Sequence, residues 1–190
     1  MSSAEPRRTG DAGISLRAVA REAITHALDA GREPELDPSR YPPKLREPGA
    51  SFVTLHLDGG LRGCTGSLQA TRPLVCDVAH NACRSAFRDP RFPPLAAPEL
   101  GELVVSVSVL GPLEPLEVTS ERELLAALRP GVDGLVLSEG AASATFLPAV
   151  WESLPEPRAF LDALRRKAGL PPGHWSPALR CQRYTATEAA

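Results

Sequence analysis

The sequence predicts an α+β fold in which helices flank a mostly antiparallel or mixed sheet. Residues 14–30 and 74–88 carry apolar side chains at helical spacing, whereas residues 103–110 alternate apolar and polar side chains as a half-buried strand does. Strands and helices do not alternate regularly along the chain, which argues against a doubly wound parallel sheet. The length of 190 residues fits one domain, or one domain with two lobes.

The first predicted element is a helix over residues 14–30, which follows a polar segment. Residues 1–13 are expected to be a disordered N-terminal tail. Ser15 is placed to cap the helix, and Gly31 stands where a C-terminal glycine is expected. Residues 31–49 then form a proline-rich connector without periodicity, which we expect to be functional or packed in extended form across the surface.

A β-hairpin is predicted next, with a loop at Asp58-Gly59-Gly60. A three-residue loop with Gly60 left-handed sets its register. The predicted pairs are Leu57 with Leu61, His56 with Arg62, Leu55 with Gly63 and Thr54 with Cys64. This register gathers His56, Arg62, Thr54 and Cys64 on one face. A two-residue loop would instead place Arg62 beside Leu55 on the apolar face, where an unpaired guanidinium is costly.

The second long helix is predicted to begin at Pro73 with Thr71 as its cap, and to end near Arg88. Its polar residues lie opposite its apolar stripe and could face a cleft, but a solvated helix face is the favoured interpretation. They are Asp77, His80, Asn81 and Arg84. Residues 89–94 form a stiff loop, because Asp89 precedes Pro90 and is restricted to extended geometry.

The remaining elements alternate irregularly between strand and helix. A capping box at Ser120 and Glu123 starts a short helix over residues 121–128. The other expected elements are strands over 134–138, 144–147 and 179–185, and a helix over 157–168 that ends at Gly169. Trp151 and Trp175 are interpreted as core or lobe-interface aromatics.

Composition excludes several classes of protein. The net charge of −2 and the scattered basic residues argue against a nucleic-acid-binding protein. No apolar run is long enough to span a bilayer, and no secretory leader is visible. The four cysteines, Cys64, Cys76, Cys83 and Cys181, show no CxxC spacing. We therefore expect a soluble, cytoplasmic protein with free thiols.

A series of motifs, in order, resembles the AMMECR domain family, whose microbial members are called AmmeMemoRadiSam system protein A. The motifs lie at residues 52–55, 61–68, 88–95, 105–110, 133–135, 145–151 and 167–171, and at Asn81. The resemblance covers residues 14–187, which we take as one AMMECR domain. The family's hallmark is a six-residue motif, here residues 61–66, and Thr65 replaces the isoleucine that usually follows the cysteine.

The resemblance implies a two-lobed α+β fold with a cleft between the lobes, but it does not imply a reaction. It also implies possible partners, a Memo-like protein and a radical SAM protein. The family's hexapeptide is assumed to be functional, and its positions here are Leu61, Arg62, Gly63, Cys64, Thr65 and Gly66.

Cys64 is the candidate catalytic residue, because a thiolate is a strong nucleophile and a neighbouring Arg62 or protonated His56 would lower its pKa. The alternative is that Cys64 only packs. Arg62 could clamp a carboxylate or phosphate, or could pair internally with Asp89 or Asp77. The candidate ligand-binding residues are Arg62, Gly63, Thr65, Gly66, Ser67, His56, Asn81, Asp89 and Arg91. Asp89 and Arg91 have an equally good structural interpretation as loop anchors.

No cofactor and no metal are predicted. Cys64, His56 and His80 are ligand types that suit zinc or copper, but their spacing fits no known signature. Glycine loops of the Walker or dinucleotide type are absent from the sequence. The predicted function is an enzyme or enzyme component that binds a small anionic or polar ligand at residues 61–67. The alternative is a non-catalytic adaptor whose groove recognises a partner protein.

Overall fold

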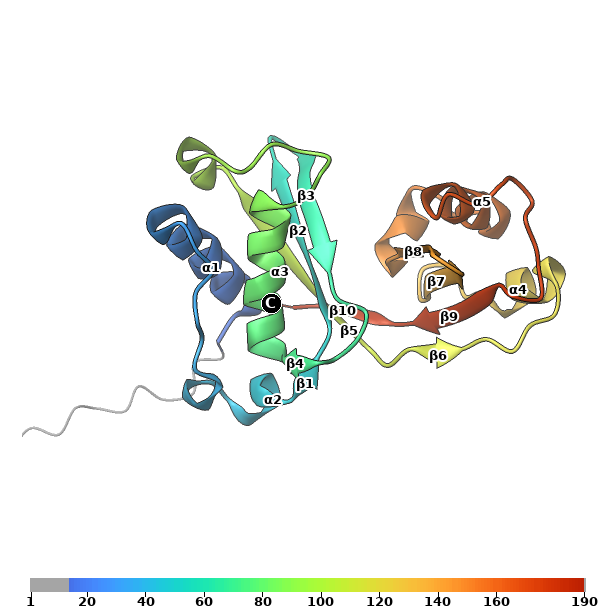
Figure 1. Ribbon diagram of the computed structural model, residues 1–190, viewed down its shortest axis with the longest axis horizontal. Helices are drawn as coiled ribbons and strands as arrows, with labels where there is room; N and C mark the ends of the chain where they lie inside the picture. Colours follow the sequence, from blue (N-terminus) through green and yellow to red (C-terminus); the bar gives the residue numbers. More distant parts are fainter. Residues whose placement is uncertain (1–13, 190) are drawn as a thin grey trace, which may run out of the picture. The chain divides into compact units, whose positions relative to one another are not determined.

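The computed structural model describes residues 14–189, which divide into two compact units (Figure 1). Unit 1 comprises residues 14–108 and 188–189 of the described chain, and unit 2 comprises residues 109–187. The expected tail, residues 1–13, lies outside the described residues. The mixture of helices and antiparallel sheets confirms the α+β class.

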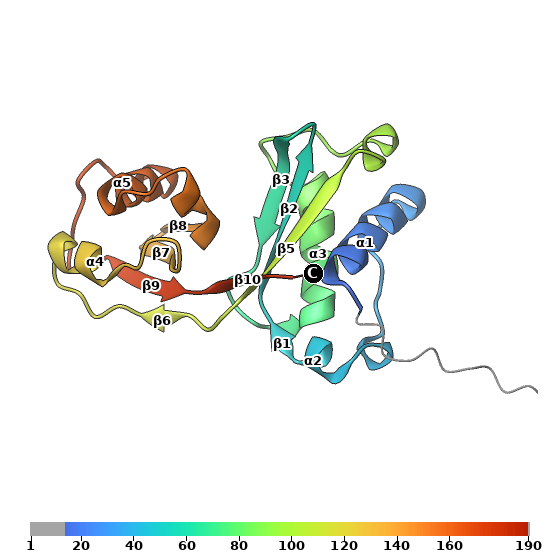
Figure 2. The ribbon, with the colours of Figure 1, turned by 180° about the vertical axis from the view of Figure 1, so that it is seen from behind.

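Unit 1 is built on two helices, α1 (Leu16–Ala30) and α3 (Leu74–Phe87), which pack against each other. The C-terminal glycine of α1 is Gly31, whose φ of 70° and N–H bond to the Ala27 carbonyl oxygen close the helix as predicted. The N-cap of α3 is Pro73 rather than Thr71. Both helices lie on the same face of the unit 1 sheet (Figures 1 and 2).

The sheet of unit 1 has the strand order β10 (Ala186–Glu188), β5 (Val104–Leu110), β2 (Ser51–Leu57), β3 (Gly60–Gly66), so β3 is an edge strand. Val53, Leu55 and Val107 are buried. Because side chains alternate along a strand, Thr54 and His56 point to the face opposite α3, where both are partly exposed. The sheet therefore has one face packed by helices and one face with accessible polar side chains.

The β2–β3 turn differs from the prediction. Asp58 and Gly59 both have positive φ, 51° and 76°, which defines a two-residue turn of the Asp-Gly type, and Gly60 opens β3 opposite Leu57. Arg62 is the extra residue of a β-bulge, since Leu61 pairs with His56 while Gly63 pairs with Leu55.

The bulge restores the predicted pairs of Leu55 with Gly63 and of Thr54 with Cys64. The predicted pairs of Leu57 with Leu61 and of His56 with Arg62 are wrong, because Leu57 pairs with Gly60 and His56 pairs with Leu61. In a regular hairpin, a two-residue loop would place Arg62 on the apolar face, and the predicted three-residue loop avoids this. The bulge removes that conflict, because it takes Arg62 out of the alternation.

The connector between α1 and β2 is mainly extended, with two short helical turns, η1 (Pro38–Arg40) and α2 (Pro43–Arg46). It ends in β1 (Pro48–Gly49). This strand pairs with β4 (Arg72–Pro73), which directly precedes α3 in the chain. After α3, the loop that begins at Arg88 leads to a short 3-10 helix, η2 (Ala97–Leu100).

The polar residues of α3 are not all solvated, which corrects the favoured sequence interpretation. Asp77 and Asn81 are fully buried. The Asp77 carboxylate accepts hydrogen bonds from Ser51 N–H (2.9 Å), Ser51 Oγ (2.7 Å) and Ser67 Oγ (2.8 Å). The Asn81 amide donates to Ser67 Oγ (3.0 Å) and to the Ser51 carbonyl oxygen (3.1 Å). This network fastens α3 to the start of β2 and to the segment that follows β3.

Unit 2 contains a second sheet, in the order β6 (Glu114–Pro115), β9 (Arg180–Tyr184), β7 (Gly134–Glu139), β8 (Ala142–Phe146). Its helices are α4 (Glu121–Ala127), η3 (Pro148–Glu152) and α5 (Pro157–Lys167), the last of which packs on β8. The predicted cap of α4 is present, because Ser120 Oγ accepts from Glu123 N–H. Trp151 is a core residue of this unit and stacks on Phe160 with ring centroids 3.8 Å apart.

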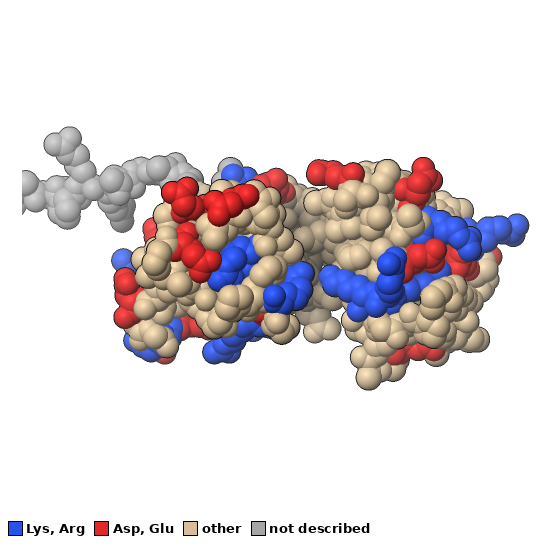
Figure 3. Space-filling model, turned by 90° about the horizontal axis from the view of Figure 1, so that it is seen from above, with Lys and Arg blue, Asp and Glu red and all other residues tan. Residues whose placement is uncertain are grey.

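The surface carries charges of both signs. Figure 3 shows Lys and Arg mixed with Asp and Glu over the face of each unit that is in view. The two signs are nearly equal in number, as the net charge of −2 shows. Among the described helices, none is both long and apolar enough to cross a membrane.

Candidate functional site

Cys64 lies near the middle of edge strand β3, on the sheet face opposite α3, and is partly exposed. Its Sγ is 3.4 Å from Thr54 Oγ1 on β2. Directly opposed residues that do not exchange backbone hydrogen bonds bring their side chains closest together in an antiparallel pair, and Thr54 with Cys64 is such a pair. The thiol and the hydroxyl therefore form one accessible polar patch.

The outer backbone edge of Cys64 is occupied by the loop that follows α3. Cys64 N–H donates to Asp89 Oδ2 (2.9 Å), and Arg91 Nη2 donates to the Cys64 carbonyl oxygen (3.3 Å). The two side chains of the loop thus take the place of a neighbouring strand. Asp89 and Arg91, which were predicted as site residues, are brought to Cys64 by this contact.

Asp89 and Arg91 form a tight ion pair. Arg91 donates from Nε to Asp89 Oδ1 (2.9 Å) and from Nη2 to Oδ2 (2.7 Å). Hydrogen bonds from Arg91, together with the one from Cys64 N–H, lower the pKa of the buried Asp89 carboxyl to about 2 against the opposing effect of burial. Asp89 is therefore a carboxylate throughout the physiological range. The Arg91 side chain is about half exposed, and among the described residues its Nη1 forms no hydrogen bond.

Arg62 has neither of the predicted internal partners. Its Nε and Nη2 donate to the two carboxylate oxygens of Glu99 at 2.6 and 3.0 Å, and Glu99 also accepts from Ala96 N–H. These bonds lower the pKa of Glu99. Arg62 Nη1 is buried and unpartnered within the described residues, and the guanidinium lies 6.0 Å from the centre of the Phe92 ring.

Sequence reasoning missed Glu99. The available signal was an acidic residue in a capping position, three residues after Ala96, but its pairing with Arg62 spans 37 residues and cannot be read from local spacing. Through this pair Arg62 anchors η2, and with it the loop that carries Asp89 and Arg91.

The glycines of the hexapeptide serve packing inside the protein. A Cβ at Gly63 would lie 2.2 Å from the Ser85 carbonyl oxygen of α3, and a Cβ at Gly66 would lie 2.3 Å from the Phe52 ring. At Gly63 the backbone of β3 thus comes close to the protein's own helix α3. Substituting valine at Gly63 would break helix–sheet packing rather than fill a groove.

Three other predicted site residues lie apart from the Cys64 thiol. Ser67 and Asn81 belong to the buried network with Asp77. His56 pairs with Leu61, and within the described chain no hydrogen bond or ion pair joins its ring to Arg62 or Cys64. The neighbour of the Cys64 backbone that carries a positive charge is Arg91, not His56 or Arg62.

Comparison with known proteins is decisive at this point. Residues 17–189 match the family model AMMECR1. The chain belongs to the AMMECR1 family. A protein of Methanothermobacter thermautotrophicus is 38% identical to it over 182 residues, which cover 93% of this chain and 92% of that protein.

The fold of this AMMECR1-family chain is also shared with a solved structure. The crystal structure of uncharacterised protein PH0010 from Pyrococcus horikoshii has a TM-score of 0.85 and 37% identity, with 91% of this chain and 88% of that chain covered. Protein MK0488 of Methanopyrus kandleri is 37% identical over 175 residues, 88% of this chain and 82% of that protein. The recognition of the family and of the α+β class from sequence is confirmed.

In the hexapeptide of this AMMECR1-family chain, some residues hold the strand in place and others are accessible to solvent. Arg62, Gly63 and Gly66 hold β3 against η2, α3 and Phe52. Cys64 and Thr65 remain partly exposed, and Leu61 is 42% exposed. Cys64 is therefore a partly exposed free thiol within the motif.

Burial disfavours the thiolate form of the other three cysteines. Burial raises the pKa of Cys83 to about 12 and that of Cys181 to about 11, and it also raises the pKa of the partly exposed Cys76. No group of three or more His, Cys, Asp or Glu side chains in residues 14–189 is arranged to hold a metal ion. His80, one of the ligand types considered, bonds instead to Glu33 through Nδ1 at 2.9 Å.

Proposed function

We propose that unit 1 binds a small anionic or polar ligand on the sheet face at Cys64, and that the chain acts as an enzyme or enzyme component. Cys64 contacts the ligand or attacks it as a nucleophile. The observation that carries this proposal is the partly exposed Cys64 beside a half-exposed Arg91, whose Nη1 is free to bind an anion.

The chemistry follows from the residue types. A guanidinium binds carboxylate or phosphate oxygens through charge-assisted hydrogen bonds, and a nearby positive charge favours the thiolate form of a cysteine. Asp89 neutralises one side of Arg91 and fixes it in place, so only the Nη1 side is available to a ligand. Arg62 is a positioning residue in this proposal, because its guanidinium is held by Glu99.

The partners belong to the same proposal. On the family resemblance, the chain works with a Memo-like protein and a radical SAM protein. The adaptor alternative would need a docking edge, and β3 is the exposed edge strand with Leu61 on it. Asp89 and Arg91 already occupy the outer backbone groups of Cys64, which disfavours addition of a partner strand there.

The test measures protection of Cys64 from alkylation. Phosphate, sulfate and acetate are titrated at constant ionic strength, and the rate of iodoacetamide labelling at each cysteine is followed by mass spectrometry. We expect saturable protection of Cys64 that is lost in Arg91→Gln and kept in Arg84→Gln, a matched change at an exposed arginine of α3. Cys76 serves as the internal reference because it is also partly exposed. Equal labelling of Cys64 at all anion concentrations would remove the basis for the ligand site.

A second comparison separates enzyme from adaptor. Purified Memo-like and radical SAM proteins are tested for association with wild type and with Cys64→Ser. If the chain is an enzyme that uses the thiol, Cys64→Ser still associates with the two proteins, but the mixture of the three proteins no longer forms its product. Unchanged function of the combined system with Cys64→Ser would favour the adaptor.

A further inference from the structure

Unit 2 contains a pocket of about 860 Å³ that belongs entirely to residues 115–182 of that unit. This volume is in the range of small-molecule sites. The pocket lies at the edge of the β6–β9 pair, far along the sequence from the hexapeptide. None of its lining residues takes part in the function proposed for unit 1.

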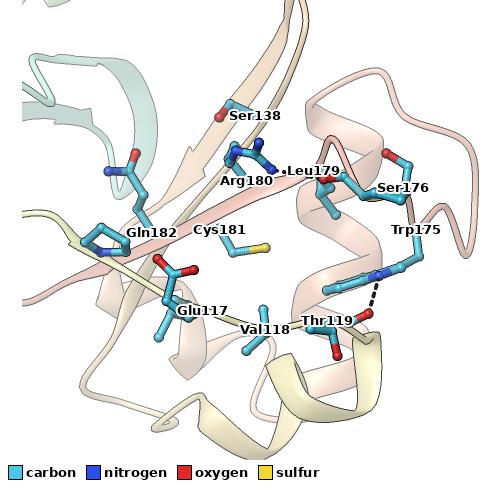
Figure 4. Close-up of a pocket in the computed structure, with 13 residues that line it drawn as sticks. Glu117, Val118, Thr119, Ser138, Trp175, Ser176, Leu179, Arg180, Cys181 and Gln182 are labelled. Atoms are coloured by element: carbon cyan, nitrogen blue, oxygen red, sulfur yellow. Dashed lines mark hydrogen bonds between the residues drawn. The ribbon is translucent and has the colours of Figure 1, made fainter.

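The pocket exists because β6 is only two residues long while β9 continues. Leu116 N–H makes the last backbone bond, to the Cys181 carbonyl oxygen (2.9 Å), and the following segment then diverges from β9. The far end is closed by Trp175, whose Nε1 donates to the Thr119 carbonyl oxygen (3.1 Å). Figure 4 shows the indole, the diverging segment and β9 around one open space.

One side of the pocket is apolar. Leu116, Val118 and Trp175 are partly buried and pack on the core of unit 2, to which Leu179 and Cys181 belong. The Cys181 thiol is directed into the space in Figure 4. Burial raises the pKa of this thiol to about 11, so it presents a neutral, polarisable wall.

The polar lining is provided by side chains on the other face of the strands. Ser138 and Arg180 are paired across β7 and β9, and Gln182 follows two residues later. Arg180 is exposed and donates from Nη1 to the Pro177 carbonyl oxygen (3.0 Å). Among the described residues its Nε and Nη2 form no hydrogen bond, so one edge of this guanidinium is available to an anion. The exposed Glu117 also lines the pocket and limits the anionic group to the Arg180 side.

We propose that this pocket binds a small aromatic anion, with its flat apolar body against Trp175 and its carboxylate or sulfonate on Arg180. The indole offers the large apolar surface that aromatic ligands contact, and the guanidinium offers charge-assisted bonds to two oxygens. The site is separate in sequence and in residues from Cys64, so its success or failure is independent of the unit 1 proposal.

The test uses two probes that share one ring system. 1-Anilinonaphthalene-8-sulfonate carries the anionic group, and N-phenyl-1-naphthylamine lacks it. Arg180→Gln is expected to weaken binding of the sulfonate at least about tenfold and to leave the neutral probe within about twofold. Arg122→Gln, at an exposed arginine of α4 in the same unit, should change neither.

Location is read from the two indole N–H signals in a proton–nitrogen correlation spectrum. The Trp175 signal, assigned with Trp175→Phe, should shift on titration with the sulfonate, whereas that of Trp151, bonded to the Asp133 carbonyl oxygen in the core, should not. Three results would each overturn the proposal. They are binding of the sulfonate without a shift of the Trp175 signal, an equal loss of affinity for both probes in Arg180→Gln, and no binding of the sulfonate by the folded protein.

Discussion

At the scale of single residues, Gly63 and Asp89 fix strand β3 in different ways, Gly63 from within the strand and Asp89 from the loop that follows α3. Gly63 has no side chain because the Ser85 carbonyl oxygen of α3 occupies the space. Asp89 closes the open edge of β3 at Cys64 and is held ionised by Arg91. The motif around Cys64 is thus fixed from the helix side by sterics and from the edge side by charge.

Gly63→Ala should destabilise the protein by about 3 kcal/mol, since its Cβ would meet backbone 2.2 Å away that cannot move without shifting α3. Gly101→Ala is the matched control, because a Cβ there meets nothing within 4 Å. Urea unfolding of the two variants measures the difference. Equal stability of both variants would show that α3 does not approach β3 as described.

Asp89→Asn should lower the free energy of unfolding by about 2 kcal/mol at pH 7, because the pKa of Asp89 is about 2 in the folded protein and its ordinary value is 3.8. A carboxyl whose pKa is depressed by folding stabilises above its unfolded pKa, and this contribution is lost as pH falls through the folded pKa. The gap between wild type and variant should therefore be constant from pH 7 to 5 and shrink below pH 4. Asp29→Asn, at an exposed position of α1, should show no such gap. A gap that stays constant down to pH 3 would contradict the assignment.

At the scale of elements, the β-bulge and η2 act together. The bulge releases Arg62 from the strand alternation, and Glu99 on η2 receives its guanidinium. The positions of the long helices and their ends at Gly31 and Gly169 could be predicted from local residues. The hairpin could be predicted too, but its two-residue turn was not, because the turn type depends on the bulge in β3. The bulge and the Arg62–Glu99 pair could not, because both depend on contacts between segments that are distant in sequence.

Glu99→Gln should loosen the loop between α3 and η2, because a buried guanidinium loses its charged partner. We expect faster amide hydrogen exchange in residues 89–96 and a loss of about 1 kcal/mol of stability, discounted because Glu99 is partly exposed. Glu102→Gln, an exposed neighbour of η2, is the control. Unchanged exchange in the loop of Glu99→Gln would show that the pair does not anchor it.

At the scale of the whole molecule, each unit has a core of its own. Val53, Val78 and Val107 are fully buried in unit 1, and Leu124, Phe160 and Leu161 are fully buried in unit 2. The fold class and the family could be predicted, because hydrophobic periodicity and the order of motifs can be read directly from the linear sequence. The pairing of Asp77 with Asn81 in a buried network was not visible, because polar residues opposite an apolar stripe resemble a solvated face.

Leu161→Ala should cost about 3 kcal/mol and accelerate amide exchange within residues 109–187, with little change in unit 1. The reason is that the deleted side chain packs in the core of unit 2. Hydrogen-exchange mass spectrometry on the full chain measures the amide exchange rates of both units at once. Val78→Ala is the reciprocal experiment, which should accelerate exchange in unit 1. Uniform acceleration over both units in each variant would contradict two separate cores.

The central proposal is that Arg91, whose Nη2 donates to the Cys64 carbonyl oxygen, binds an anion close to the Cys64 thiol. The most direct measurement is the ratio of Cys64 alkylation rates by iodoacetate and iodoacetamide at low ionic strength, because the reagents differ mainly in charge. The ratio for Cys64 should exceed that for Cys76 in wild type and fall several-fold in Arg91→Gln, but not in Arg84→Gln. A ratio that is the same at both cysteines and insensitive to Arg91→Gln would contradict the claim.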